Sequence, residues 1–323
     1  MGALPQGLER RRVPPMSAFR FAHFSDPHLP LAPNRLSGRG FFTKQLLSYL
    51  SWQRKKRHVH QPAVLDCLVA DIQAAAPDHI ACTGDIANIS WPGEFQRGRD
   101  WLARVGPPQQ VSYIPGNHDA MVSVPFAQGL GLWRDYMQGD RPLAPDAPLP
   151  DGLFPALRRR GPVAFIGLNS GVPTAPLLAT GRLGPAQVEA LGDMLADLGR
   201  ERLFRVVMVH HPVALGVVRR RKGLSDAAPL RRLLARTGAE MLLHGHAHRA
   251  SLAMLKGPSG LIPSLTVPSA SAIRHGRYPA AQWNLVTVDT DGGGWRVQVE
   301  TRGYDGAGAM CPVTDYTLLL PWA

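Results

Sequence analysis

Gly116-Asn117-His118-Asp119 directly follows a strand-like run at 111–114 and is the stretch that decides the fold. Four comparable fragments occur along the chain, each at the end of an apolar strand-like run: Asp26-Pro27-His28, Gly84-Asp85, His210-His211-Pro212 and Gly245-His246-Ala247-His248. Taken alone, each fragment is explained by a common turn or by a histidine whose hydrogen bonds are satisfied. Together they offer carboxylate, amide and imidazole groups that suit two neighbouring divalent metals. Ligands gather at strand carboxyl ends in parallel sheets, so we expect the fragments to meet.

The composition is that of an ordinary globular protein with a basic surplus. Of 323 residues, 45% are hydrophobic and 19% charged, and 36 Lys and Arg against 24 Asp and Glu leave a net charge of +12. Such a surplus attracts phosphate-rich polyanions, either nucleic acid or anionic lipid headgroups, and a basic surface that only keeps the protein soluble is an equal alternative. Cys67, Cys82 and Cys311 are too scattered for a disulfide framework, which favours a reducing compartment.

The first residues, 1–16, lack the apolar core of a secretory signal, and we expect them to form a disordered tail. No run approaches the ~20 apolar residues that span a bilayer. These features predict a cytoplasmic protein, with peripheral contact to the cytoplasmic membrane face as a further option.

Segments of strand character alternate with helical ones through the first part of the chain, which indicates βαβ units. After His248 the pattern changes to strands without long helices between them, and a glycine-rich hairpin at 291–294 joins two of these. We therefore predict an α/β fold in which two mixed sheets pack face to face with helices outside, a four-layer αββα sandwich, as one domain over 17–323. The expected strands are 19–25, 79–83, 111–114, a pair near 153–157 and 163–168, 204–209, 240–243, 251–255, 261–267, 283–289, 295–300 and 316–320, and the expected helices are 63–76, 94–104 and 185–198.

The five fragments resemble the pattern D-x-H, G-D, G-N-H-[DE], H and G-H-x-H of the calcineurin-like metallophosphoesterase superfamily, and the resemblance extends over nearly the whole chain. It implies the same sandwich fold and a binuclear metal centre, with Mn or Fe expected and Zn or Co also compatible with mixed ligands. It also implies two metal sites that share a bridging Asp85: Asp26, His28, Asp85 and His248 for one metal, and Asp85, Asn117, His210 and His246 for the other.

His118 has no metal role in that pattern and is expected to stabilise or protonate the departing alkoxide, with Asp119 orienting its imidazole. The alternative is that His118 only caps the loop of Asn117. Two cations about 3.5–4 Å apart share a hydroxide that attacks phosphorus in line, and they neutralise the phosphoryl oxygens.

Four more residues are candidates for substrate binding: Asn88, His211, Arg219 and Arg220. For Asn88 a turn-stabilising role is an equal alternative. For His211 we expect a place in the wall of the cleft. For the two arginines, solvated surface charge is the alternative.

The interval between His28 and Asp85 exceeds what a simple crossover requires, since a complete βαβ unit takes about 30 residues. The surplus, at about 29–61, follows a metal fragment directly and should border the active site. It contains aromatic and leucine residues of a predicted helix and then a basic cluster: Phe42, Leu46, Tyr49, Trp52, Arg54, Lys55, Lys56 and Arg57. Such a segment is either an interfacial helix that rests among lipid headgroups or a lid packed on its own domain.

This insertion resembles that of bacterial phospholipase C enzymes of the superfamily. The resemblance implies a phosphodiesterase that cleaves a phosphodiester of a membrane phospholipid or another lipid-linked phosphate. A cyclic-nucleotide or other soluble phosphodiesterase is the main alternative, because the same metal fragments serve both. A non-catalytic nucleic-acid-binding module is a remote alternative, and without an RRM, KH or helix-turn-helix signature we do not expect specific nucleic-acid binding.

Overall fold

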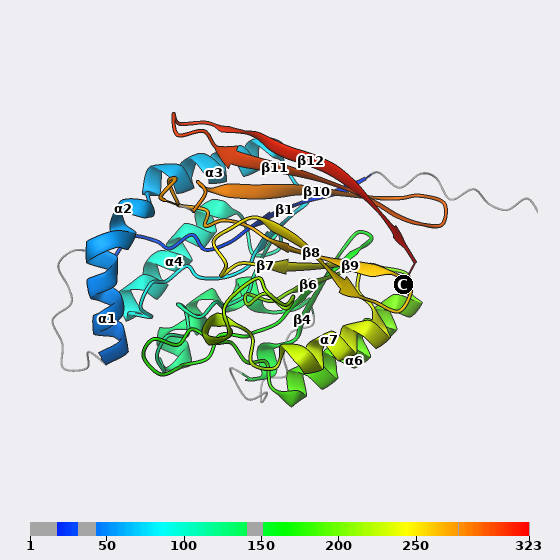
Figure 1. Ribbon diagram of the computed structural model, residues 1–323, viewed down its shortest axis with the longest axis horizontal. Helices are drawn as coiled ribbons and strands as arrows, with labels where there is room; N and C mark the ends of the chain where they lie inside the picture. Colours follow the sequence, from blue (N-terminus) through cyan, green and yellow to red (C-terminus); the bar gives the residue numbers. More distant parts are fainter. Residues whose placement is uncertain (1–17, 32–42, 141–150, 277, 323) are drawn as a thin grey trace, which may run out of the picture.

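The computed structural model describes residues 18–31, 43–140, 151–276 and 278–322. The predicted tail at 1–16 and Phe42 lie outside the described residues. The strands form two six-stranded sheets with helices on their outer faces (Figure 1). The first sheet has the order β12-β11-β10-β1-β2-β3 and comprises β1 (Phe19–Phe24), β2 (His79–Cys82), β3 (Val111–Tyr113), β10 (Gln282–Thr290), β11 (Gly294–Tyr304) and β12 (Met310–Pro321). The second has the order β4-β5-β6-β7-β9-β8 and comprises β4 (Ala156–Arg160), β5 (Val163–Gly167), β6 (Phe204–Met208), β7 (Met241–His244), β8 (Ser251–Lys256) and β9 (Leu261–Thr266).

The helices lie mainly in the connections between parallel strands. The α-helices are α1 (Thr43–Ser51), α2 (Arg57–Val59), α3 (Pro62–Ala75), α4 (Pro92–Val105), α5 (Arg134–Met137), α6 (Pro185–Arg200) and α7 (Ala227–Thr237). Between α1 and α2 lies a π-helical turn, η1 (Trp52–Lys56), and the 3₁₀ turns are η2 (Phe126–Gln128), η3 (Leu130–Trp133), η4 (Asp151–Leu153) and η5 (Arg220–Lys222). Proline occupies the start of α3, α4 and α6, where its missing N–H costs no helical hydrogen bond.

Both sheets are mixed, as predicted. Strands β1, β2 and β3 are parallel, whereas β10 pairs antiparallel with β1. In the second sheet β5, β6, β7 and β9 are parallel, and β4 and β8 are antiparallel edge strands. The predicted α/β fold with two mixed sheets and helices is therefore confirmed. The parallel strands bring their carboxyl ends to one edge of each sheet, where ligands bind in such folds.

The alternation of side chains along a strand explains the layers. On β1, Phe21 points between the sheets and makes an edge-to-face contact with Phe165 of β5, with the ring centroids 5.2 Å apart. Phe24 lies on the opposite face and packs edge-to-face against Trp101 of α4, with the ring centroids 6.1 Å apart. The second sheet has a separate core against α6 and α7, to which Val207 of β6 belongs. Burying one such side chain contributes about 1.5–3 kcal/mol, so both faces of each central strand stabilise the sandwich.

A buried ion pair fixes the two central strands of the second sheet relative to each other. Arg205 of β6 makes two hydrogen bonds to the carboxylate of Glu240, which immediately precedes β7, at 2.9 and 2.8 Å. The same guanidinium also donates to the Leu195 and Thr237 carbonyls at the helix layer. The pair therefore fixes the amino ends of β6 and β7 relative to each other, and His210 and His246 follow the carboxyl ends of the same strands.

The structure corrects two boundaries and adds one helix. Strand β4 begins at Ala156 rather than near 153, because Pro155 has no N–H to donate to a strand partner. Strand β12 is much longer than the predicted 316–320. Helix α7 was not anticipated, although Leu230, Leu233 and Leu234 have helical spacing and are buried. Within the described residues, no helix has the length and apolarity to cross a bilayer.

Candidate metal centre

Five loops at the carboxyl ends of strands meet in one place and carry the predicted metal ligands. Three follow β1, β2 and β3 of the first sheet, and two follow β6 and β7 of the second. His248 is half-buried, and the other predicted ligands are buried: Asp26, His28, Asp85, Asn117, His210 and His246. The centre is thus assembled from both sheets.

Asp26, His28 and His248 converge on one side of this centre. His28 Nε2 lies 3.4 Å from His248 Nε2, and Asp26 Oδ1 lies 3.8 Å from the former and 3.1 Å from the latter. Asp26 Oδ2 accepts a hydrogen bond of 3.0 Å from the backbone N–H of His246. Oδ1 is buried and has no hydrogen-bond partner among the described residues. A carboxylate oxygen that faces two imidazole nitrogens in this way is suited to share a cation with them.

The second group lies on the other side and contains Asp85, Asn117, His210 and His246. His210 Nε2 lies 3.3 Å from Asp85 Oδ2 and 3.2 Å from Asn117 Oδ1. His246 Nε2 is also buried with no partner in the described part of the chain. One ligand atom each from Asp85, His210 and His246 lies within 4.8 Å of the others.

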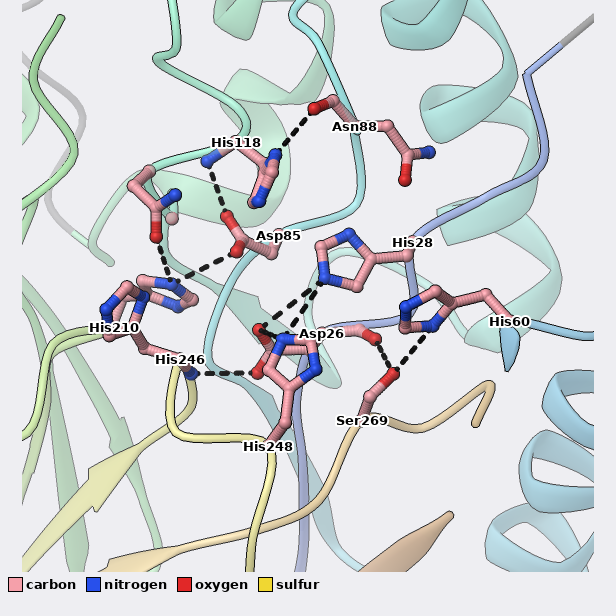
Figure 2. Close-up of polar contacts among 12 residues, drawn as sticks. Asp26, His28, His60, Asp85, Asn88, His118, His210, His246, His248 and Ser269 are labelled. Atoms are coloured by element: carbon pink, nitrogen blue, oxygen red, sulfur yellow. Dashed lines mark hydrogen bonds and ion pairs between the residues drawn. The ribbon is translucent and has the colours of Figure 1, made fainter. Parts of the chain in front are cut away.

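Asp85 occupies the position between the two groups (Figure 2). Ligand atoms of His28, Asp85 and His118 also lie within 4.8 Å of one another, so the Asp85 side chain is close to both groups. Its Oδ1 accepts a hydrogen bond of 2.7 Å from the His118 backbone N–H. The remaining oxygen faces His210, which is a geometry compatible with a bridging carboxylate.

The backbone at this centre is strained. Five of the predicted ligands have positive φ: Asp26 at 54°, His28 at 42°, Asp85 at 62°, His246 at 63° and His248 at 50°. Each such residue costs of order 1–3 kcal/mol and persists only where its surroundings fix it. Glycine is required beside them, because a Cβ at Gly116 would collide with the Asp85 carboxylate and one at Gly245 with the Asp26 carboxylate.

Hydrogen bonds set the orientation of the imidazoles. His210 Nδ1 lies 2.6 Å from the Thr83 carbonyl, and His28 Nδ1 lies 3.3 Å from the Ala87 carbonyl. Because a carbonyl only accepts, Nδ1 is the donor in both rings, and Nε2 is the nitrogen that faces the centre. A backbone acceptor behind the ligating ring is the arrangement seen in metal-binding histidines.

The charges at the centre are balanced between carboxylates and imidazoles. Burial lowers the pKa of His28 and His246 well below the usual value, so both rings are neutral at pH 7. Burial opposes ionisation of Asp26 and Asp85, but the facing histidines outweigh it and lower the pKa of both carboxyls. Burial also opposes a charge on His210, yet Asp85 raises the pKa of His210 to about 9. A metal held here by His210 would have to displace the proton that this ring carries at pH 7.

These residues fit a pair of divalent cations. Two carboxylates, one amide and four imidazoles provide mixed oxygen and nitrogen donors, which suit Mn, Fe, Zn and Co. The unpartnered Asp26 Oδ1 and His246 Nε2 are the atoms that such cations would satisfy.

His118 projects over this centre from the loop after β3. Its Nδ1 donates to the Asn88 carbonyl at 2.5 Å, and its Nε2 lies 3.1 Å from Nζ of Lys56. Burial and the Lys56 ammonium lower the pKa of His118 to about 3. The ring is therefore neutral, and its Nε2 accepts a hydrogen bond from Lys56.

The structure corrects the expectation that Asp119 orients the His118 ring. Asp119 Oδ2 accepts hydrogen bonds from the N–H groups of Asp85 and Gly116, both at 2.8 Å, and from the Tyr113 hydroxyl. Asp119 Oδ1 accepts from the Ala87 N–H at 2.8 Å. Burial and the Asp85 charge raise the pKa of Asp119 to about 7. Asp119 thus ties together the loops after β2 and β3, and the Asn88 carbonyl orients His118 instead.

Asn88 and His211 are buried rather than open to a substrate. The Asn88 side-chain amide donates to the Leu29 carbonyl at 2.6 Å, and Asn88 therefore has the turn-stabilising contact that was the alternative. His211 Nδ1 lies 2.8 Å from the Ser170 hydroxyl, and its ring packs against His246 with centroids 4.5 Å apart. His211 supports a ligand from behind, because burial removes it from the expected cleft wall.

The basic run after β6 reaches the centre through one residue. Arg219, Arg220 and Lys222 are all exposed, but of these three only Lys222 lines the cavity above the centre. The expected role of Arg219 and Arg220 beside the substrate is therefore better matched by Lys222.

Residues 43–60 of the predicted insertion at about 29–61 form one wall of the site, here called the insertion wall. Its buried contacts come from Gln45, whose amide donates to the Ile89 carbonyl at 2.9 Å, and from Tyr49 and Trp52, which pack near Ile89. Leu46, another apolar residue of this predicted helix, is 43% exposed. Of the basic cluster, Arg54 and Arg57 are exposed, and Lys55 and Lys56 line the cavity.

His60 is a residue of the site that the sequence fragments did not indicate. It ends the insertion wall, is buried, and has its ring 4.7 Å from that of His28. Burial lowers its pKa well below the usual value. It follows a helix rather than a strand, so the strand-end signal that found the other histidines does not apply to it.

A cavity of about 430 Å³ opens above the centre. Its wall includes Lys56, Asp85, His118, Lys222 and His246. A second groove of about 310 Å³ shares Lys56, Asn117, His118, Ala179 and Lys222 with it. The other side of this groove is mostly apolar and includes Leu47, Met121, Pro176, Leu177 and Leu178.

Comparison with known proteins agrees with this geometry. A family model described as calcineurin-like phosphoesterase matches residues 19–250. A curated relative, a probable cyclic nucleotide phosphodiesterase of Synechococcus sp., is 26% identical over 232 residues, which cover 71% of this chain and 78% of the relative.

Two solved structures share the fold at 13% sequence identity. A dimetal phosphatase from Danio rerio has a TM-score of 0.53, and the match covers 94% of this chain and 99% of that one. A purple acid phosphatase from yellow lupin (Lupinus luteus) seeds has a TM-score of 0.58, with 94% of this chain and 54% of that one covered.

Proposed function

Since the chain belongs to the calcineurin-like phosphoesterase family and is a metal-dependent hydrolase, we propose that it is a phosphodiesterase whose substrate is a membrane phospholipid or another lipid-linked phosphodiester. The observation that carries the phosphodiesterase assignment is the convergence of seven ligand side chains below a cavity of about 430 Å³ with lysines in its wall. This volume lies in the range of small-molecule sites, about 300–1,000 Å³.

We assign Asp26, His28, Asp85 and His248 to one divalent metal and Asp85, Asn117, His210 and His246 to the other. Bound there, two cations activate water as a nucleophile and neutralise phosphoryl oxygens. We expect Mn or Fe as the native metals. The chain itself provides rigid placement, because the backbone at five of these residues is fixed in positive φ.

Lys56 and His118 are proposed to act together on the departing alkoxide. At pH 7 His118 is neutral, since burial and Lys56 lower its pKa to about 3, and it accepts a hydrogen bond from Lys56. Burial lowers the pKa of Lys56 to about 8, which leaves it mostly protonated at neutral pH. The pair therefore holds a mobile proton at the edge of the cavity, where a leaving oxygen needs one.

The groove beside His118 favours the proposal of a lipid-linked substrate. Lys44 Nζ donates to the Thr174 carbonyl at 3.0 Å and so ties α1 to the segment that carries Leu177 and Leu178. Leu47 and Leu178 both line this groove and are 46% and 40% exposed. Apolar groups next to a cationic phosphate site match a ligand with a charged head and an acyl chain.

A cyclic nucleotide is the second candidate substrate. The relative from Synechococcus sp. is named a probable cyclic nucleotide phosphodiesterase, and the catalytic residues proposed above would serve either substrate. The two candidates differ in their need for the groove, because a cyclic nucleotide has no acyl chain to place there.

Product analysis by mass spectrometry separates these candidates. Mn-loaded enzyme would be mixed in turn with bis(p-nitrophenyl) phosphate, a panel of long-chain phospholipids, nucleotide-linked lipids and cyclic nucleotides. We expect cleavage of bis(p-nitrophenyl) phosphate and of a phospholipid. Cleavage of cyclic nucleotides without lipids would support the second candidate, and no cleavage of any phosphodiester with Mn, Fe, Zn or Co would refute the phosphodiesterase assignment.

A pair of groove variants tests the lipid substrate directly. Leu47→Ser with Leu178→Ser should reduce turnover of long-chain phospholipid about 10-fold, because about 1.5 kcal/mol or more of apolar contact is lost. Turnover of bis(p-nitrophenyl) phosphate should stay within about 2-fold. Leu252→Ser is the matched control, since Leu252 is 41% exposed on β8 and does not line the groove.

A further inference from the structure

His60 stands beside one half of the metal centre although it belongs to none of the five strand-end fragments. One ring nitrogen each from His28, His60 and His248 lies within 4.8 Å of the others. The His60 ring centroid is 4.7 Å from that of His28 and 5.9 Å from that of His248. Figure 2 shows His60 on the side of Asp26 and His28, away from His210 and His246.

The hydrogen bonds of His60 assign its proton to the nitrogen that faces away from the centre. Nδ1 lies 2.9 Å from the Ser271 hydroxyl and 3.2 Å from the Ser269 hydroxyl. Ser269 donates its own proton to the Asp26 carbonyl at 2.6 Å, so it can only accept from Nδ1. Nδ1 is therefore the protonated nitrogen, and Nε2 retains its lone pair, as in metal-binding histidines with a hydrogen-bonded second nitrogen.

The backbone around His60 is fixed from two directions. The His60 N–H donates to the Lys56 carbonyl at 2.9 Å, which closes the end of the insertion wall. On the other side, Gln61 N–H donates to the Ser271 carbonyl at 2.7 Å and Ile273 N–H to the Val59 carbonyl at 2.9 Å. The loop that carries Ser269 and Ser271 thus holds both the backbone and the ring of His60, which gives the placement that a ligand needs.

We propose that His60 is an additional imidazole ligand of the metal that Asp26, His28, Asp85 and His248 hold. The insertion then contributes to the metal centre itself as well as to its wall. The two sites become unequal, because three imidazoles serve this metal and two serve the other. Imidazole favours later first-row divalent metals over Mn, so the site with His60 should be the tighter one for Co or Zn. The proposal rests on the binuclear centre and does not depend on which phosphodiester is cleaved.

Metal titration of the full chain tests this proposal without any measurement of turnover. Apoprotein made with a chelator would be titrated with Co²⁺ by calorimetry and by visible absorption. His60→Gln should weaken one of the two binding steps about 10-fold or more and leave the other within about 2-fold. The matched control is His58→Gln, which changes an exposed histidine of the same segment. Unchanged affinity at both sites would overturn the proposal.

A second variant guards against a purely structural effect of removing the ring. His60→Cys places a thiol at the same position, and a cysteine that binds Co²⁺ adds a thiolate-to-metal absorption band absent from the wild type. Appearance of this band on Co²⁺ loading supports direct ligation at position 60. Its absence, in apoprotein whose thermal unfolding matches that of the wild type, overturns it. Both outcomes are independent of the phosphodiesterase assignment, which the product analysis tests separately.

Discussion

The ligand loops and the insertion wall enclose the same cavity but are built in opposite ways. The ligand loops, which follow β1, β2, β3, β6 and β7, are buried, and their backbone is held in strained conformations by reciprocal hydrogen bonds. The insertion wall is a short helical segment with exposed leucines and basic side chains that reaches the centre through Lys56 and His60. The difference indicates that the loops fix most of the chemistry, while the exposed part of the wall, apart from Lys56 and His60, can vary with the substrate at little cost to the fold.

The largest effect should come from the centre of the ligand loops. Asp85→Asn removes the charge that lies between the two ligand groups and so weakens both. We expect a loss of at least about 10³-fold in kcat for bis(p-nitrophenyl) phosphate, together with loss of bound metal measured by elemental analysis. Asp100→Asn, at an exposed carboxylate of α4, should leave both quantities unchanged. Full metal content with near-normal turnover would show that Asp85 is not central.

His118 lies where the two regions meet and should give the next largest effect. His118→Ala, with the metals retained, should lower kcat about 10²–10³-fold for substrates with an alkoxide leaving group. The loss should be much smaller for a p-nitrophenolate leaving group, which departs without a proton. Equal losses for the two leaving groups would assign His118 to loop structure rather than to leaving-group stabilisation.

Lys56 tests whether the insertion wall contributes to chemistry as well as to recognition. Lys56→Met keeps the stem of the side chain but removes the hydrogen bond to His118, and we expect a loss of about 10-fold in kcat/KM. Lys55→Met is the matched control, because Lys55 lines the same cavity one residue earlier. Equal effects of the two changes would mean that only general positive charge matters there.

The pH dependence should show the smallest effect. Burial lowers the pKa of Lys56 to about 8, so the amine is charged below this pH and loses its proton as pH rises through it. The activity that depends on Lys56 is therefore present at neutral pH and falls above about pH 8. In Lys56→Met this alkaline decrease should disappear from the kcat/KM profile. A decrease that persists unchanged would have to come from another group.

The same contrast explains how much of the site could be predicted from the sequence. The proposed metal ligands were recognisable because each stands at the end of an apolar run within a short fragment, and the topology brings strand ends together. The contacts of Asp119 and His60 depend on distant loops. Asp119 accepts a hydrogen bond from the N–H of Asp85, which lies 34 positions away in the sequence. His60 is hydrogen-bonded to Ser271, which lies 211 positions away. No local pattern records such pairings.

The fold itself was predictable where periodicity and strand spacing are strong, as in β1, β2, β6 and the helices that begin with proline. The insertion wall was not, because the helical spacing of Leu46, Tyr49 and Trp52 does not say which side faces the protein. In the structure Gln45 takes the buried position and Leu46 remains exposed. The hydrogen bond from the buried Gln45 amide to a backbone carbonyl favours this orientation of the helix. Hydrophobicity alone predicts that Leu46 would be buried and Gln45 exposed.

The position of β1 in the first sheet has a consequence for biosynthesis. β1 is a central strand whose two neighbours are β2 and, across more than half the chain, β10. One side of β1 therefore stays unpaired while the ribosome adds the segments in between, at about 5–20 residues per second. Because Ser269 and β10 follow all of the proposed metal ligands in the chain, the site reaches its folded geometry only after β10 has been synthesised. Chaperones that shield open strand edges should bind the nascent chain until then.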